Sequence, residues 1–347
     1  MRSSYVLPLR WTEPGPIAEL ASYLREIGAE VDEVLVVDGS PPPLFERHAA
    51  ALAGSVRHLP PHPDLSFQMG KVNGVVTGVR EAESDLIVIA DDDVRYDRAS
   101  LRRTLALLAE VDLVRPQNYF DELPWHARWD TARSLLNRVF TGDPVFPVGD
   151  FPGTLAVRRE TFLRSGAYDG DALFENLELM RTIHAAGGTV ATPLDLYVAR
   201  RPPSAAHFLS QRVRQAYDDF AVPARFAAFL AVLPTAAALL HRRRGRRLGA
   251  AALASIAVAE VGRRRAGGRR HFPLSGSLLA PVWICERSLC CWIALAERRA
   301  GGVRYGDRRL PHAATSVRRL RRRYSEGSSA GAGSSESPLS ARNPIAL

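Results

Sequence analysis

Short runs of β-prone apolar residues alternate with helical patterns along the first ninety residues. The apolar runs predict strands over residues 5–9, 33–38, 56–59 and 86–90. Apolar residues at helical spacing, bounded by Pro and Gly, predict helices over residues 16–27, up to about 52, and 70–83. A β-α-β-α-β-α-β order calls for a parallel sheet with right-handed crossovers. The sequence therefore predicts an α/β fold for this part of the chain.

Three consecutive carboxylates, Asp91, Asp92 and Asp93, follow the strand at 86–90. Adjacent carboxylates repel one another unless a cation or a hydrogen-bond network neutralises them. The carboxyl end of a central strand is also where open α/β sheets bind ligands. Mg²⁺ or Mn²⁺ holding a substrate phosphate is the natural occupant. By itself, the run fits a solvated turn or the start of a helix equally well.

A second acidic strand end, Asp38, is predicted to share the rim with Asp91–Asp93. Two acidic strand ends at one rim make a site for a ribose, a base or a metal-bound diphosphate. Neither strand is followed by a Gly-rich phosphate-binding motif, so a metal has to neutralise the phosphates. Lys71 is the only lysine in the chain, which indicates a phosphate contact, although chance survival at a helix start explains it equally well.

Six motifs resemble, in order and approximate spacing, those of the family 2 glycosyltransferases, which are inverting, metal-dependent nucleotide-sugar enzymes. They are Val36-Val-Asp38-Gly-Ser40, Gly70-Lys71-x-Asn73, Ile89-Ala-Asp91-Asp92-Asp93, residues 149–154 with 157–159, residues 174–179, and Gln211-Arg-Val-Arg214-Gln215. The run Ile-Ala-Asp-Asp-Asp-Val-Arg looks most like the membrane-associated ceramide glucosyltransferase and hopanoid-type branch. The resemblance covers roughly residues 5–220. It implies a GT-A fold, with a mostly parallel sheet flanked by helices and a Rossmann-like nucleotide-binding half.

The resemblance also implies roles at the donor side of the site. Asp38 is expected to contact the nucleotide base, and Asp91 the ribose or diphosphate. Asp93, with Asp91, is expected to bind the metal, and Asp92 is the variable residue between them. Lys71 is expected to contact the diphosphate. The turn at 149–154 is expected to shape the sugar and acceptor pocket.

Gln211 and Arg214 resemble the family's Gln-x-x-Arg-Trp element, which lies near the diphosphate and the acceptor. Gln215 stands where the tryptophan is expected, so the acceptor platform is altered or supplied by Tyr217. Together with Lys71, Arg214 is expected to neutralise the leaving diphosphate.

The general base is the second departure from the family pattern. Glu175-Asn176 stands where the family commonly has Glu-Asp, with the aspartate as base, and an amide cannot accept a proton at neutral pH. Glu175 is therefore the best candidate, with Glu178 and Asp150 behind it. The alternative for Glu175 is an ordinary first-turn acid on a helix over about 177–186.

Apolar runs cover residues 226–240, 248–261 and 278–296, and none reaches the ~20 residues needed to cross a bilayer. If the first run crossed outward, the arginine-rich loop at 241–247 would lie outside, against the positive-inside rule. We therefore expect a hairpin in the cytoplasmic leaflet, with its arginines on anionic headgroups. A soluble hairpin packed on the enzyme is the alternative.

Charge divides the chain in the same way. Residues 241–324 hold 21 Lys and Arg against 4 Asp and Glu, whereas residues 1–240 hold 24 against 31. The predicted domains are a GT-A glycosyltransferase domain over 1–220, a basic membrane-associated helical region over 221–324 and a disordered tail over 325–347. The basic runs lack interleaved aromatic residues, so no nucleic-acid partner is expected.

The sequence thus predicts an enzyme at the cytoplasmic face of the cell membrane. No signal peptide or disulfide framework argues otherwise. It would transfer a hexose from a nucleotide-diphosphate sugar to a hydroxyl of a lipid or membrane-proximal acceptor, using Mg²⁺ or Mn²⁺. The alternative is a non-catalytic membrane-surface binding protein on a degenerate glycosyltransferase scaffold. A metal-dependent phosphatase is a distant third, because the hydroxyl residue that such enzymes place after the acids is missing.

Overall fold

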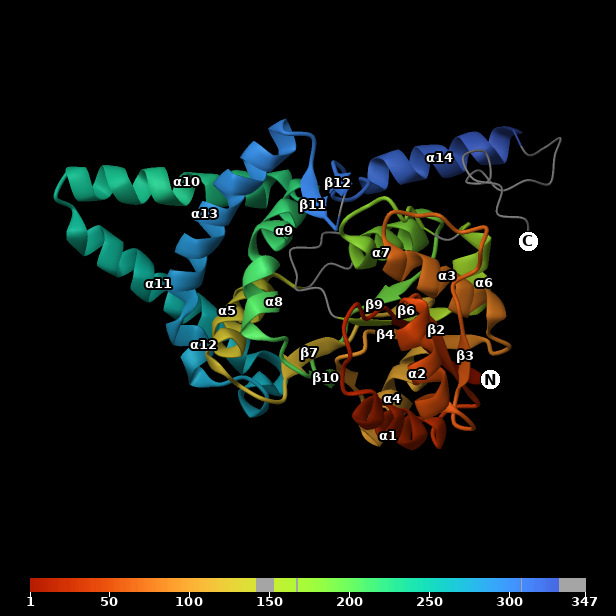
Figure 1. The fold of residues 1–347 in the computed structure, drawn as a ribbon. Helices are drawn as coiled ribbons and strands as arrows, with labels where there is room; N and C mark the ends of the chain where they lie inside the picture. The colour runs from red at the N-terminus through yellow and green to blue at the C-terminus, as the bar shows by residue number, and fades with distance from the viewer. Residues whose placement is uncertain (142–152, 167, 307, 331–347) are drawn as a thin grey trace. The chain divides into compact units, whose positions relative to one another are not determined.

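The computed structural model describes residues 1–141, 153–166, 168–306 and 308–330. The described chain forms two compact units, each with its own elements (Figure 1). The first unit contains residues 1–116, 153–198 and 315–330, and the second contains residues 117–141 and 199–314.

A seven-stranded sheet lies at the centre of the first unit, in the order β3-β2-β1-β4-β8-β6-β9. Its strands are β1 (Ser3–Leu9), β2 (Glu33–Asp38), β3 (Arg57–Leu59), β4 (Leu86–Ala90), β6 (Leu113–Val114), β8 (Thr154–Arg158) and β9 (Val190–Ala191). Pairing is parallel from β3 to β4 and between β6 and β9, whereas β8 runs antiparallel to both of its neighbours. The predicted α/β class and mostly parallel sheet are confirmed.

Helices and short strands complete the first unit. They are α1 (Ile17–Gly28), α2 (Pro42–Leu52), α3 (Gly70–Glu81), β5 (Val94–Arg95), α4 (Arg98–Leu108), α6 (Arg159–Arg164), α7 (Glu175–Ala185) and α14 (Val317–Ala330), with β10 (Tyr197–Arg200) at the unit boundary. Every strand and helix predicted for residues 1–90 is present, with ends shifted by a few residues. Helix α3 packs closely on β1 at Gly74. A Cβ added there would lie only 2.9 Å from Pro8 Cβ, so the absence of a side chain permits this approach.

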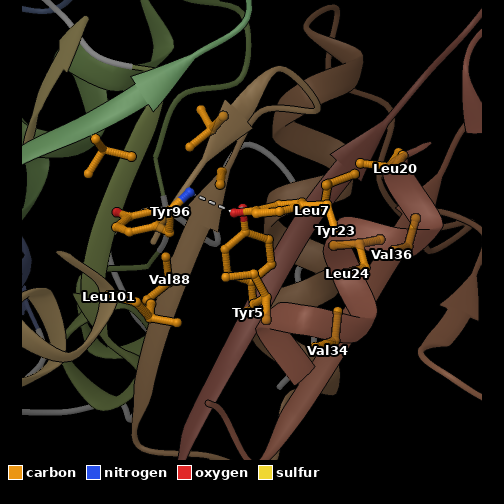
Figure 2. Packing of buried hydrophobic residues seen from close by; sticks show 14 of the residues in the cluster. Tyr5, Leu7, Leu20, Tyr23, Leu24, Val34, Val36, Val88, Tyr96 and Leu101 are labelled. Atoms are coloured by element: carbon orange, nitrogen blue, oxygen red, sulfur yellow. Dashed lines mark hydrogen bonds between the residues drawn. The ribbon is translucent and has the colours of Figure 1, made fainter. Parts of the chain in front are cut away.

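Tyrosines join the strands and helices of the buried core (Figure 2). Tyr5 of β1 is fully buried, and its hydroxyl lies 3.2 Å from that of Tyr23 on α1. The Tyr23 hydroxyl in turn accepts a hydrogen bond of 2.8 Å from the backbone N–H of Tyr96. The Tyr96 hydroxyl lies 3.0 Å from Thr154 Oγ1 at the start of β8. These bonds satisfy buried polar groups and link β1, α1 and β8 through Tyr96, which follows β5.

The second unit is mainly helical. Its elements are β7 (Gln117–Phe120), α5 (Trp125–Phe140), α8 (Ala205–Ser210), α9 (Arg212–Tyr217), α10 (Pro223–His241), α11 (Gly245–Arg264), α12 (Leu274–Leu278), α13 (Ala280–Arg299), β11 (Val303–Tyr305) and β12 (Arg308–Leu310), with 3₁₀ turns at Asp218–Ala221 and Arg265–Arg270. Buried Arg138 of α5 donates to the carbonyls of Gly262 and Arg265. Helix α5 therefore belongs with α11, although more than a hundred residues separate them.

The compact units do not divide the chain at residues 220 and 324, so the predicted functional domains stay a prediction. The C-terminal segment returns to the first unit, where α14 packs on α7. Glu178 accepts a hydrogen bond from the backbone N–H of Thr315, and Arg181 donates to its carbonyl at 2.9 Å. Tyr324 of α14 donates to the carbonyl of Ser165 at 2.8 Å. Helix α14 continues to Ala330, into the predicted disordered tail; the rest of that tail lies outside the described residues.

Helix α10 corrects the expectation that no apolar segment is long enough to cross a bilayer. It extends the 226–240 run at both ends to 19 residues, about 28 Å at the helical rise. Among the described residues, it is the one helix long and apolar enough to cross a membrane, as judged by length and composition. Phe226 is its only buried residue. The reason for the difference is local, because Pro223 provides a helix start three residues before the apolar run.

Candidate functional site

The candidate site lies at the carboxyl ends of β1, β2 and β4. Strand β2 pairs with one edge of β1, and the chain later returns to form β4 at the other edge of β1, so the strand order reverses there. Ligands bind at such switch points in open α/β sheets. Trp11, just beyond β1, connects the neighbouring strand ends: its backbone N–H donates to Ser40 Oγ at 2.9 Å and its indole Nε1–H donates to Asp92 Oδ2 at 2.6 Å. The predicted common rim of Asp38 and Asp92 is therefore present.

Lys71, on the first turn of α3, lies between two carboxylates. Its Nζ is 2.6 Å from Asp91 Oδ1 and 2.8 Å from Glu175 Oε1. Burial lowers the pKa of the Lys71 ammonium, but attraction to Asp91 and Glu175 outweighs burial and raises the pKa well above the ordinary lysine value. Lys71 is therefore charged. It connects Asp91, the predicted ribose or diphosphate contact, with Glu175, the predicted general base.

Two loops place Lys71 beside Glu175. The backbone N–H of Met69, just before α3, donates to the carbonyl of Gly170 at 3.0 Å. Asn73 of the Gly-Lys-x-Asn motif holds the same loop, since its side-chain amide exchanges two hydrogen bonds of 3.1 Å with the backbone of Phe67. A Cβ at Gly170 would clash with the Phe67 side chain, so this close approach requires glycine. The starts of α3 and α7 are thereby held together.

Asp38 is buried at the end of β2. Its Oδ1 accepts from the backbone N–H of Ser40 at 2.9 Å, and its Oδ2 lies 2.7 Å from His48 Nδ1 and 3.1 Å from His58 Nε2. Burial raises the pKa of Asp38, but the hydrogen bonds from His58, Ser40 and His48 outweigh it and bring the pKa well below the usual range. Because the carboxylate is fully covered, the predicted contact with a nucleotide base requires one of these histidines to move.

The sequence did not single out Trp11, His48 or His58. Trp11 lies edge-on to His48, with ring centroids 5.0 Å apart. His58 lies in β3, beside Val36 of β2. No spacing pattern marks these three residues, because they come from a loop, a helix and a strand that only the sheet brings together.

The carboxylates suit a hard divalent cation that arrives with its own ligands. In the described part of the chain, no group of three or more His, Cys, Asp or Glu side chains is placed to hold a metal ion. Asp91 and Asp93 supply hard oxygen donors, and Mg²⁺ is usually held by one or two carboxylates together with substrate phosphates and waters. The donor set therefore fits a cation shared with a diphosphate, rather than a metal held by protein ligands alone.

Helix α7 begins at Glu175, the candidate base. Glu178, the reserve candidate, is fully buried and accepts a hydrogen bond from the backbone N–H of Thr315, which makes it a poorer candidate than Glu175. Asp150, the other reserve, lies outside the described residues with most of the predicted 149–154 turn. The described end of that turn adjoins the site, since the backbone N–H of Asp91 donates to the carbonyl of Gly153 at 2.8 Å.

Gln211 and Arg214 belong to the second unit. Arg214 donates to Gln211 Oε1 at 3.3 Å, and its guanidinium lies 4.7 Å from the centroid of the Tyr305 ring. Tyr217 is fully buried and donates to the carbonyl of Pro311 at 2.9 Å. The expectation that Tyr217 supplies an acceptor platform is therefore wrong, because its ring is used in packing.

No protein-family model and no curated protein sequence matches the chain. Among solved structures, it is similar to a mannosyltransferase from Pyrobaculum calidifontis in complex with GDP-Man and Mn²⁺, with a TM-score of 0.51, 21% identity, and coverage of 84% of this chain and 87% of that chain. Glucosyl-3-phosphoglycerate synthase from Mycobacterium tuberculosis, in complex with Mn²⁺, UDP and glucosyl-3-phosphoglycerate, gives a TM-score of 0.40 and 18% identity over 59% of this chain and 74% of that one. The first likeness, together with the strand order, shows that this chain has the GT-A type fold of glycosyltransferases.

Proposed function

We propose that this chain is an inverting, family 2 type glycosyltransferase that moves a hexose from a nucleotide-diphosphate sugar to a hydroxyl of a lipid or membrane-proximal acceptor. The observation that carries the proposal is the Asp91–Lys71–Glu175 arrangement at the switch point of the sheet. It places a cation, a carboxylate suited to a metal and a candidate base within one small region. The mannosyltransferase of similar fold is described in complex with GDP-Man and Mn²⁺, which supports the same class of donor and metal.

The donor side is assigned to the rim carboxylates. Asp91 and Asp93 would hold Mg²⁺ or Mn²⁺, and Asp92 would be positioned by its hydrogen bond from Trp11. The metal would supply positive charge to the leaving diphosphate. Lys71 would contact the same diphosphate. Asp38 would contact the base of the nucleotide, either directly or through the histidines that cover it.

The acceptor side is assigned to Glu175. As the acceptor oxygen bonds to the anomeric carbon, the bond from that carbon to the diphosphate oxygen breaks and its electron pair leaves with the diphosphate. The acceptor proton passes to the Glu175 carboxylate. The pair with Lys71 weakens Glu175 as a base in the free protein, because a nearby cation favours the charged carboxylate. Donor binding would draw Lys71 toward the diphosphate and restore that basicity. Gln211 and Arg214 stay proposed contacts to diphosphate and acceptor, from the family resemblance.

The proposed partner of the second unit is an anionic membrane surface, at the cytoplasmic face of the cell membrane. Helix α10 is apolar and mostly exposed, and the segment that follows it carries arginines at 242–244, 246 and 247, all of them exposed. An apolar surface next to arginines is the pattern of interfacial membrane segments. A lipid or membrane-proximal acceptor follows from this placement.

A second candidate is a non-catalytic membrane-surface binding protein on the same scaffold. Asn176 and Gln215 favour it, because both depart from the family pattern at functional positions. The ion pair that occupies Glu175 in the free protein also favours it. This protein would bind a nucleotide without turning it over.

Ligand-dependent thermal stability separates these candidates. Each common nucleoside diphosphate is added with and without Mn²⁺, and the melting temperature is expected to rise only when metal and one nucleotide are both present. Release of nucleoside diphosphate from the matching nucleotide sugar, with membrane lipids as acceptor, then distinguishes enzyme from binding protein. If no combination of nucleotide and metal stabilises the protein, both proposals fail.

A further inference from the structure

Helices α12 and α13 are apolar on the outside. Between residues 274 and 296, every exposed position carries an apolar side chain: Leu274, Leu278, Val282, Cys285, Leu289, Trp292, Ile293 and Ala296. These positions recur mainly every three or four residues, so they form one stripe along the helices. We call these eight residues the α12–α13 stripe. A helix on the surface of a water-soluble protein shows charged and polar residues there instead.

The polar residues of the same segment turn inward. Glu286 accepts a hydrogen bond of 2.9 Å from Arg212 of α9, and Arg287 is buried with Asp219 at 3.8 Å. Ser288 is buried and donates to the carbonyl of Phe229 at 2.6 Å. The charges that interrupt the apolar run in the sequence are therefore paired with protein groups and absent from the exposed face.

This surface is confined to one unit. Of the large apolar side chains exposed in the described residues, all but Met1 belong to the second unit. Leu278 and Leu289 remain 55% and 54% exposed, which is far above the exposure of a leucine in a packed core. Contiguous exposed apolar surface of this kind marks an interaction site.

We propose that the α12–α13 stripe is the face on which the second unit docks in the plane of an anionic lipid bilayer. The inference rests on the membrane partner proposed above and assigns it to a surface. Exposed arginines bound the stripe at both ends: Arg269 and Arg270 precede it, and Arg298 and Arg299 follow it. Arginines at both ends of an apolar face match the headgroups of an anionic leaflet.

The same arginines disfavour a second copy of this chain as the occupant. Two copies meeting through the stripe would bring arginine pairs of like charge together as the apolar faces became buried. The opposite face of α13 packs against α9 and α10 of its own unit. Only one side of α13 is therefore open to lipid. Docking in the plane of the bilayer requires such a one-sided helix, whereas full insertion does not.

The test compares vesicle binding by two variants of the full chain. Leu278→Glu/Leu289→Glu places carboxylates in the stripe, and Leu209→Glu adds the same side chain at an equally exposed leucine of α8, which is 59% exposed. Both are mixed with phosphatidylcholine vesicles with and without phosphatidylglycerol, at low and physiological salt. Each of the two substitutions in the double variant is expected to lower the vesicle partition coefficient at least about tenfold. The Leu209→Glu variant is expected to partition like the wild type. Equal binding by the double variant and wild type overturns the proposal.

A second readout does not depend on charged substitutions. Brominated acyl chains in the vesicles should quench a tryptophan signal that Trp292→Phe removes, because Trp292 lies in the stripe. Absence of such quenching in vesicle-bound wild type overturns the proposal. The proposal is also overturned if the wild type is a dimer, the double variant is a monomer and both bind vesicles equally, because a second copy then covers the stripe.

The nucleotide and Mn²⁺ melting assay on the same proteins separates this inference from the enzymatic one. Loss of vesicle binding with an intact metal-dependent shift supports the stripe and shows that the first unit is folded. If wild type shows no shift with any nucleotide but binds vesicles through the stripe, the glycosyltransferase proposal fails and the docking face stands.

Discussion

Lys71 and Glu175 form an ion pair of 2.8 Å, although 104 residues separate them in the sequence. The same ammonium lies 2.6 Å from Asp91, which makes Lys71 the counterion of two carboxylates from different elements. A buried or half-buried charge is costly unless it is paired, so these three side chains depend on one another. A diphosphate entering the site would compete with both carboxylates for the one ammonium.

Lys71→Met is expected to destabilise the protein, because it removes the shared counterion of Asp91 and Glu175. The cost should be about 1–3 kcal/mol, below that of a fully buried pair because these side chains keep some solvent contact. Urea unfolding measures it, and Lys71→Arg, which keeps the charge, is the matched control. A Met variant as stable as wild type would mean that the pairing contributes nothing to the fold.

Asp93→Asn is expected to abolish metal-dependent donor binding and leave the fold intact. The amide keeps the size of the side chain and removes the charge that a hard cation requires. Calorimetric titration with nucleoside diphosphate, with and without Mn²⁺, measures the effect, and Asp97→Asn, at the start of α4, serves as a control outside the rim. An unchanged Mn²⁺ dependence in the Asp93 variant would show that the metal assignment is wrong.

Glu175→Gln is expected to lower the transfer rate 10²–10⁴-fold, as typical for loss of a general base, with donor affinity little changed. The matched control is Glu160→Gln, on the exposed surface of α6. Asn176→Asp, which restores the family's residue, should be tolerated. Full activity in Glu175→Gln, combined with a loss in Asp150→Asn, would move the base to the 149–154 turn and leave the enzyme class standing.

Glu178→Gln should change how stability depends on pH. Burial raises the pKa of Glu178, and the hydrogen bonds from Thr315 only partly offset it. A carboxyl with a raised folded-state pKa stabilises the fold most when protonated, so its contribution is present below the unfolded value of about 4.3 and is lost as the pH rises through the folded value. The Gln variant lacks this loss and should equal or exceed wild type at neutral pH. Urea unfolding of both proteins between about pH 4 and 8 measures this difference. Parallel curves of unfolding free energy against pH would contradict the prediction.

Truncation should show that the C-terminal segment is part of the first unit. A chain ending at residue 314 loses Leu320, which is 3% exposed, and uncovers Glu178 and Arg181. Loss of the buried leucine alone should cost about 1.5–3 kcal/mol. A chain ending at residue 330 keeps these contacts and is the control. Equal melting temperatures for the two would refute the role of α14. For the same reason, a deletion from residue 221 onward removes more than the part proposed to associate with a membrane.

The sequence by itself determined the local elements and the common rim of acids. Strands β1, β2 and β4 and helices α1 and α3 follow from apolar periodicity and from Pro and Gly signals, which act over a few residues. Parallel order then places the ends of β2 and β4 at one edge, so Asp38 and Asp91 could be assigned to one rim without coordinates.

Only the tertiary structure decided what each polar group faces. Lys71 was expected to meet a phosphate, and the fold pairs it with Asp91 and Glu175, because two loops hold the starts of α3 and α7 together. Asp38 was expected to contact a nucleotide base, and α2 and β3 cover it with His48 and His58. Such pairings depend on the rotation and approach of whole elements, which no short window of sequence contains.

The direction of the side chains in the second unit was likewise decided by packing. The sequence shows Glu286 and Arg287 within an apolar run, but not which way they point, because a shift of one position on a helix turns a side chain by about 100°. Packing against α9 and the 3₁₀ turn that follows it directs both side chains inward, to Arg212 and Asp219, and leaves leucines outside. Composition therefore indicated a membrane-associated region, and the packed helices decided which of its faces is open.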